Sequence, residues 1–192
     1  WPTQIGAAPG RIKYKDLNGD KVVNSLDQDW IGTYLPKLEY GLRVNLGYKN
    51  FDFSVFGSGV AGRKGVDAYI YYNNFVESRE NAAPGTLEAW TASNKSSDIP
   101  AATIVDNNNE KRMSTYLLRN NSYFKLRSLQ IGYNLPLDLV KKAGMSQLRV
   151  YFQGENMFWI TPKGYIGSDP ERTSIDRIPV PTSYSFGLSA SF

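Results

Sequence analysis

Residues 40–55 read YGLRVNLGYKNFDFSV, and their alternation decides the fold class. From Tyr40 to Tyr48 every second residue is large and apolar, while the residues between them are small, polar or charged. The same alternation resumes at Phe51, after Lys49-Asn50. Because side chains of a strand point alternately to its two faces, the stretch predicts two antiparallel strands joined by a two-residue turn. A register that sets Tyr48 opposite Phe51 puts every apolar side chain of the hairpin on one face.

Three further strands are expected, at residues 122–135, 147–158 and 184–192. The first of them changes parity along its length, so we expect a β-bulge near Arg127-Ser128 that keeps its apolar side chains together. A short helix is predicted from Leu137 to Ala143, closed by Gly144 as its C-cap. A second short helix is expected around residues 86–91.

Composition excludes several classes of protein. The chain has 192 residues, 41% hydrophobic and 14% aromatic, with no cysteine and no histidine. Disulfide scaffolds, Cys/His zinc sites and catalytic centres that use Cys or His are therefore excluded. No apolar run approaches the roughly 18–20 residues that a membrane-spanning helix needs. The net charge of +4 is scattered, so nucleic acid is not an expected partner.

Two architectures accommodate the strands. A soluble sandwich would bury the apolar faces of Leu46, Phe53 and Phe186 in a dry core. A membrane barrel would turn them to lipid, and nine-residue alternating stretches with aromatic ends, an opposite face of small polar residues and alternating short and long links favour it. The expected fold is all-β, with about five C-terminal antiparallel strands of a large transmembrane β-barrel and long extracellular loops. Five strands cannot close a barrel, so a fragment of a larger wall is expected.

The links between strands set the expected organisation. The short links, at Lys49-Asn50 and residues 136–146, fall on one side of the wall, which makes it the periplasmic side. The long links, at residues 61–121 and 159–182, then fall outside the cell. We therefore expect residues 1–38 to be an extracellular segment and residues 39–192 to hold the strands, turns and loops of the barrel.

Residues 16–27 match a calcium loop in the spacing of their oxygen donors. The candidate ligands are Asp16, Asn18, Asp20, the carbonyl of Val22, Asn24 and Asp27. Lys21 stands where such loops carry a glycine, and Asp27 is shorter than the usual glutamate. The alternative is an Asx-rich turn that satisfies its own backbone. If the strands formed a sandwich, the chain would be a secreted calcium-dependent β-sandwich binding module.

Candidate substrate-binding residues are aromatics able to stack on sugar rings: Tyr69, Tyr71, Tyr72, Trp90 and Trp159. The alternative for each is that it packs its own loop or marks the lipid interface. The acidic pairs Asp169/Glu171 and Glu77/Glu80 lie in loops without a supporting constellation, so a glycosidase is not favoured and no catalytic residue is assigned.

Several stretches, in this order, carry a family resemblance: GRIKYKDLNGD (10–20), IG (31–32), PKLEYGL (36–42), YKNFDFSVF (48–56), Trp90, SDIP (97–100), YFKLRSLQIGYNLP (123–136), LRVY (148–151), GENMF (154–158) and the closing strand to Phe192. Together they resemble the C-terminal part of the SusC/RagA class of TonB-dependent outer-membrane transporters. The resemblance runs along nearly the whole chain.

The resemblance implies a 22-stranded barrel with a plugged lumen in the outer membrane of a Gram-negative bacterium. Proteins of this class import oligosaccharides or peptides, driven by TonB and the proton-motive force, beneath a SusD-like surface lipoprotein that acts as a lid. The implied partners are that lipoprotein, TonB through an upstream segment, membrane lipid and a glycan or peptide ligand. The resemblance implies binding and gated passage, with no covalent chemistry.

Overall fold

The computed structural model describes residues 2–75, 83–165, 169–172 and 178–192. Contacts within the chain divide it into two compact units. The loop unit comprises the described parts of residues 2–32 and 65–119, and the sheet unit comprises those of residues 33–64, 120–172 and 178–192.

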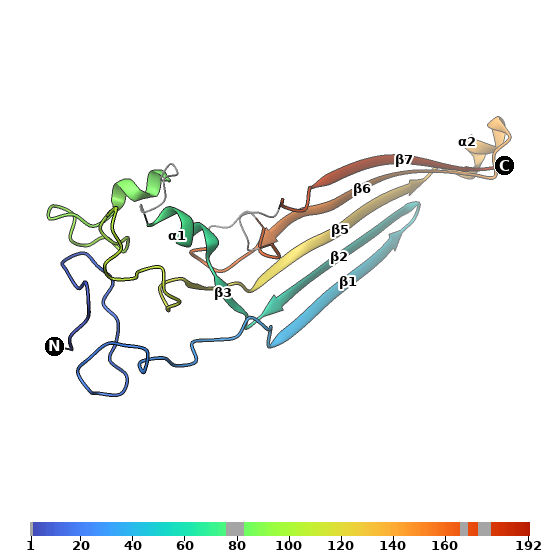
Figure 1. Cartoon of the computed structure of the whole chain (residues 1–192). Coiled ribbons are helices and arrows are strands. Elements are labelled where there is room, and N and C mark those ends of the chain that lie inside the picture. Colours follow the sequence, from blue (N-terminus) through green and yellow to red (C-terminus); the bar gives the residue numbers. More distant parts are fainter. Residues whose placement is uncertain (1, 76–82, 166–168, 173–177) are drawn as a thin grey trace. The chain divides into compact units, whose positions relative to one another are not determined.

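Five long strands form one antiparallel sheet in the sheet unit (Figure 1). They are β1 (Leu38–Tyr48), β2 (Phe51–Ala61), β5 (Tyr123–Asn134), β6 (Gln147–Ile160) and β7 (Ser183–Ser191). Their order in the sheet is β1-β2-β5-β6-β7. The five predicted strands are confirmed. Two short strands, β3 (Lys64–Val66) and β4 (Leu118–Asn120), form a separate two-stranded sheet that the sequence pattern did not predict.

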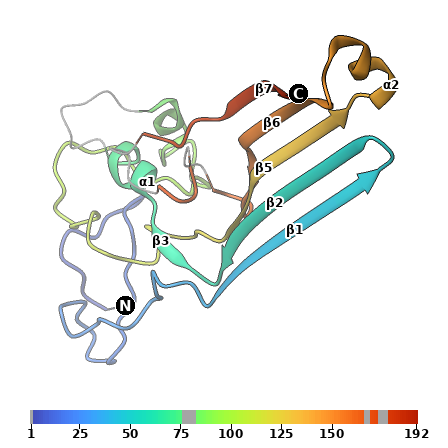
Figure 2. The same ribbon diagram turned by 90° about the vertical axis from the view of Figure 1, so that its right-hand side faces the viewer.

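One row of residues crosses all five long strands: Tyr48, Phe51, Tyr133, Val150 and Leu188. The pairing of Tyr48 with Phe51 is the predicted one. The turn residue with left-handed backbone is Lys49 (φ 53°), not Asn50, where the sequence placed the tolerance for positive φ. The hairpin turn, the helical link and the C-terminal end of β7 lie at the same end of the sheet (Figures 1 and 2). Short links therefore share one end, as predicted.

The predicted bulge in β5 is present. The β5–β6 ladder passes from Leu126 to Ser128 without Arg127, and the β2–β5 ladder shifts between Phe56 and Gly57. One additional residue reverses the parity of the strand, so the apolar side chains on both sides of Arg127 stay on the same face.

The apolar face of the sheet is uncovered within the sheet unit. Leu46 is 61% exposed and Phe186 is 83% exposed. A sandwich would bury both against a facing sheet. Among the described residues the one other sheet is the pair of three-residue strands, so the sandwich alternative is wrong.

Helices are short in both units. The predicted link helix is confirmed as α2 (Leu137–Val140) followed by the 3₁₀ turn η2 (Lys141–Ala143), and Gly144 caps it with φ 73°. The second predicted helix is the 3₁₀ turn η1 (Pro84–Glu88), slightly earlier than expected. No described helix is long and apolar enough to cross a membrane.

The loop unit has a small core of its own. Helix α1 (Ala68–Asn73) was not predicted, and Asp67 caps its N-terminus by accepting hydrogen bonds from two backbone N–H groups. The helix buries Ile70 against Phe75 and Leu117, with the half-buried Ile12 packed on them. This core joins residues from the start and the end of the loop unit.

The close approach at Gly59 gives a testable consequence for the sheet. A Cβ at Gly59 would lie 2.1 Å from the carbonyl oxygen of Tyr123 and 2.7 Å from the Tyr40 hydroxyl, whereas a Cβ at Gly47 would meet nothing within 4 Å. We expect Gly59→Ala to lower the free energy of unfolding of the full-length protein by about 1–3 kcal/mol, because backbone must shift to admit the methyl group. Urea denaturation in detergent measures this, with Gly47→Ala as the matched control. Equal effects of the two substitutions would contradict the prediction.

Candidate functional site: a two-faced sheet with a loop unit

The two faces of the sheet differ in chemistry. One face exposes large apolar side chains from all five strands: Leu42, Leu46, Phe51, Ile131, Phe158, Ile160, Tyr184, Phe186 and Leu188. The opposite face carries polar side chains that bond to one another, such as Ser54, whose Oγ donates to Oδ1 of Asn45 at 2.7 Å. This segregation suits a wall between hydrocarbon and water.

An ion pair on the polar face spans three strands. The Arg149 guanidinium of β6 donates to both carboxylate oxygens of Asp52 in β2, at 3.0 and 2.5 Å. The intervening strand β5 contributes Gly132, where a Cβ would lie 2.3 Å from the guanidinium and 2.4 Å from the carboxylate. Glycine is therefore required at this position for the pair to form above it.

A second group of charges lies on the same face, where Lys125 and Arg127 of β5 meet Asp169 and Glu171. The two carboxylates considered for acid–base chemistry are thus ion-paired with cations of the sheet. The other acidic pair, Glu77/Glu80, lies outside the described residues.

The side-chain oxygens of the acidic loop accept hydrogen bonds from the backbone of the loop itself. The two oxygens of Asp16 accept from the backbone N–H groups of Gly19 and Lys21, at 2.7 and 2.9 Å. Backbone donors, that of Asn24 first, hold the pKa of Asp27 below its usual value. The loop is therefore closed on its own backbone, as an Asx-rich turn is.

The backbone of the loop also has the turn of a calcium loop. Lys21 adopts φ 66°, the left-handed conformation that glycine ordinarily supplies at this position. All six candidate ligands are oxygen atoms, the type of ligand that a hard cation such as calcium binds. In the part of the chain that the structure describes, however, no three Asp, Glu, His or Cys side chains converge as metal ligands. Calcium binding stays a prediction.

The candidate aromatics fall into separate groups. Tyr69, Tyr71 and Tyr72 lie on α1, and the rings of the last two meet edge to face with centroids 5.0 Å apart. Trp90 lines a hollow of about 370 Å³ in the loop unit, together with Tyr116. These four residues belong to the loop unit, but the structure does not gather them into one site.

Trp159, the fifth candidate, lies in β6 of the sheet unit and not in a loop. Its ring centroid is 5.7 Å from Nζ of Lys125, so it covers a cation of the polar face.

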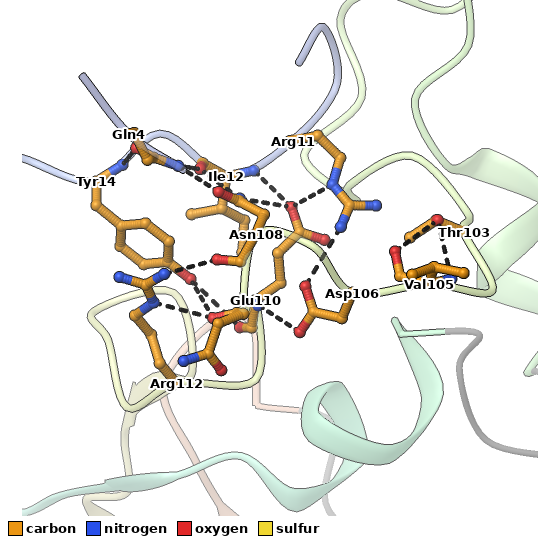
Figure 3. Close-up of polar contacts among 11 residues, drawn as sticks. Gln4, Arg11, Ile12, Tyr14, Thr103, Val105, Asp106, Asn108, Glu110 and Arg112 are labelled. Carbon is orange, nitrogen blue, oxygen red and sulfur yellow. Dashed lines mark hydrogen bonds and ion pairs between the residues drawn. The ribbon is translucent and has the colours of Figure 1, made fainter. Parts of the chain in front are cut away.

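Sequence reasoning missed a polar cluster that holds the loop unit together (Figure 3). Gln4 donates to the carbonyl of Ile12 and to the side chain of Asn108, at 2.8 and 2.5 Å, and Asn108 is fully buried. Glu110, 1% exposed, accepts from the Ile12 backbone at 2.8 Å and pairs with Arg11 at 3.2 Å. The partners lie about a hundred residues apart in sequence, so no local pattern marks them.

The surroundings of this cluster also determine the protonation state of the Tyr14 phenol. Burial raises the pKa of Tyr14 to about 12, against the opposing effect of the Arg112 guanidinium, which lies 4.2 Å over its ring. Tyr14 therefore stays protonated and serves as a structural contact.

Comparison with known proteins finds relatives that are all named TonB-dependent receptors. No family model matches the chain. TonB-dependent receptor P3 of Formosa agariphila is 31% identical over 85% of this chain and 16% of the relative. TonB-dependent receptor SusC of Bacteroides thetaiotaomicron is 30% identical over 93% of this chain and 17% of the relative. The chain thus spans about a sixth of the length of these relatives.

Solved structures give the same result for the fold. The RagAB peptide transporter matches with a TM-score of 0.73 and 22% identity, covering 90% of this chain and 19% of that one. The RagAB peptide importer in its closed-closed state matches with a TM-score of 0.71 and 25% identity, covering 95% of this chain and 21% of that one.

The sheet has one apolar face and one ion-paired face, and its fold matches part of a large barrel protein. These two observations define the chain as a piece of a barrel wall. The predicted fold class is confirmed. The resemblance to SusC/RagA-type TonB-dependent transporters is confirmed, because most of this chain is similar to a part of TonB-dependent receptors, SusC among them, and its fold matches a part of the RagAB structure. Its relatives are receptors and transporters, so the prediction that it is not an enzyme is confirmed as well.

Proposed function

We propose that the whole protein imports oligosaccharide or peptide nutrients across the outer membrane of a Gram-negative bacterium, driven by TonB and paired with a SusD-like surface lipoprotein. The observation that carries the proposal is the two-faced sheet. Its exposed apolar side chains, with Leu46 and Phe186 as examples, suit contact with lipid. Its ion-paired face, with Arg149 and Asp52, suits a water-filled interior.

The relatives support the proposal by their names, since both receptors and a peptide transporter are among them. In this arrangement the long connections and the segment 1–38 lie outside the cell, where a lipoprotein lid and the substrate arrive. The aromatics of the loop unit are the proposed substrate contacts, with Trp90 beside its hollow. Trp159 is the proposed contact on the sheet.

The function is tested by uptake into cells that produce the full-length protein. We expect labelled oligosaccharides or peptides to accumulate, and a proton uncoupler or loss of TonB to abolish the accumulation, because passage is driven by the proton-motive force. Cells that lack the protein are the control. Uptake that persists without TonB, or no difference between the two strains for either substrate class, would refute the proposal.

The apolar face gives a sharper prediction about assembly. We expect Leu46→Arg to reduce the amount of full-length protein in the outer membrane, because an arginine on a lipid-facing position costs up to about 2–4 kcal/mol. The matched control is Asn45→Arg, the neighbouring residue on the polar face. Quantitative blotting of outer-membrane fractions measures both. Equal loss in the two variants, or loss only in the control, would show that the faces are reversed or irrelevant.

We also propose that residues 16–27 bind calcium through the six predicted ligands. The spacing of the oxygens and the left-handed turn at Lys21 support the proposal. Calorimetric titration of the full-length protein should show a calcium site that Asp20→Asn weakens at least about tenfold, because affinity follows the charge count of the ligands. Asp29→Asn, an exposed carboxylate just outside the loop, should leave the site unchanged. Identical titrations of the wild type and Asp20→Asn would exclude this loop as the site.

A further inference from the structure

Three consecutive loop residues, Asp169, Pro170 and Glu171, are each held by a cation of the sheet unit. Lys125 pairs with Asp169, Arg63 donates to the Pro170 carbonyl, and Arg127 pairs with Glu171. None of these contacts belongs to the β-ladder of the sheet.

The first contact is fully withdrawn from water. Nζ of Lys125 lies 3.3 Å from Oδ2 of Asp169, and both side chains are 0% exposed. The two oxygens of Asp169 also accept from the backbone N–H groups of Glu171 and Val180, at 3.0 and 3.1 Å. A buried charge is tolerated only when it is paired and hydrogen-bonded, so loss of Lys125 would leave the Asp169 carboxylate buried without a cation.

The second contact fixes the backbone between the two carboxylates. A terminal nitrogen of Arg63 donates to the carbonyl oxygen of Pro170 at 2.6 Å. Pro170 is itself almost fully buried. The Arg63 guanidinium lies over the ring of Tyr123, 5.6 Å from its centroid, so the donor is held in place by β5.

The third contact is a bidentate ion pair, called the fork below, between Arg127 and Glu171. Two nitrogens of Arg127 donate to the two oxygens of Glu171 at 2.7 and 2.6 Å, and Lys125 and the Tyr123 hydroxyl add a donor to one oxygen each, at 3.2 and 2.9 Å. Arg127 is free for this role because it is the bulge residue, outside the ladder with β6. Its Nε is oriented by Ser58, whose Oγ accepts from it at 2.8 Å.

The electrostatics agree with this geometry. Hydrogen bonds from Arg127, more than any other donor, lower the pKa of Glu171 to about 2 against the opposing effect of burial. A carboxylate with a lowered folded-state pKa stabilises the fold above its unfolded pKa of about 4.5, and this contribution is lost only as the pH falls towards 2. The fork is therefore fully formed at neutral pH.

We propose that residues 169–171, in the connection between β6 and β7, are a latch that binds to the polar face of the sheet and narrows the solute path there. This inference rests on the proposed function, because it takes the polar face as the wall of that path. Buried ion pairs contribute little net stability but fix geometry, which is what a latch requires. Arg127 and Glu171 are 28% and 25% exposed and pair with each other, so neither presents an unpaired charge to solvent.

The latch is tested on the full-length protein with Asp169→Asn and Glu171→Gln combined, two replacements that keep size and remove charge. Trypsin digestion of the purified protein should cut after the exposed Arg172 about tenfold faster than in the wild type, because opening of the segment becomes easier. Mass spectrometry of the released peptides measures the rate at this site. The control is Asp52→Asn, which breaks an ion pair of the same face that does not reach the loop.

A charge swap distinguishes the effect of losing the ion pair from the effect of a general loss of packing. Arg127→Glu alone should accelerate opening, and Arg127→Glu with Glu171→Arg should bring opening back towards the wild type. Because Glu171→Arg adds a trypsin site beside Arg172, hydrogen–deuterium exchange of the backbone N–H groups of residues 171 and 180 measures these two variants. Unchanged cleavage in the Asn/Gln variant, or equal acceleration by Asp52→Asn, would overturn the latch.

Uptake tests the narrowing. The Asn/Gln variant should admit larger solutes than the wild type, and an unchanged size limit despite faster cleavage would overturn the narrowing role. Because digestion uses purified protein, it reports on the latch whether or not the protein imports anything, so failure of the latch and failure of the proposed function are distinguished.

Discussion

The register of the five-stranded sheet is the constraint on which the rest of the structure depends. A slip of one residue in any strand would exchange its apolar and polar faces, setting charges among oily side chains. The row from Tyr48 through Tyr133 to Leu188 shows that the register holds from one edge of the sheet to the other. The register therefore gathers exposed apolar side chains such as Leu46 and Phe186 on one face, and such a face suits contact with lipid.

The β-bulge links this constraint to the charged cluster. The additional residue in β5 restores parity, so that Leu126 and Leu129 face the same way. It also leaves Arg127 outside the ladder, with its guanidinium available to Glu171. A regular strand would lose both effects together, because the segregation of faces and the placement of this cation come from the same inserted residue.

The sequence predicted the elements that have a periodic pattern of apolar residues and those whose end is set by one characteristic residue. Alternation of period two located all five long strands, and Gly144 marked the end of the link helix. Helix α1 and the strands β3 and β4 were missed because three to six residues are too few to show a period. Asn108 was visible only as part of an asparagine-rich loop, since its burial depends on Gln4, far away in the chain.

The carboxylates of the candidate site also have partners that are far away in the sequence, which a local pattern does not reveal. Asp169 and Glu171 lie two residues apart in a loop, a spacing compatible with acid–base chemistry, with a metal or with ion pairs. Their cations, Lys125 and Arg127, lie more than forty residues away, and the strand alternation that locates β5 does not say which loop returns to it. Only the folded chain resolves this ambiguity. Arg127 donates twice to Glu171, and Lys125 and Tyr123 donate once each, so four hydrogen bonds fill the about four acceptor sites of its carboxylate and its role is to hold the loop.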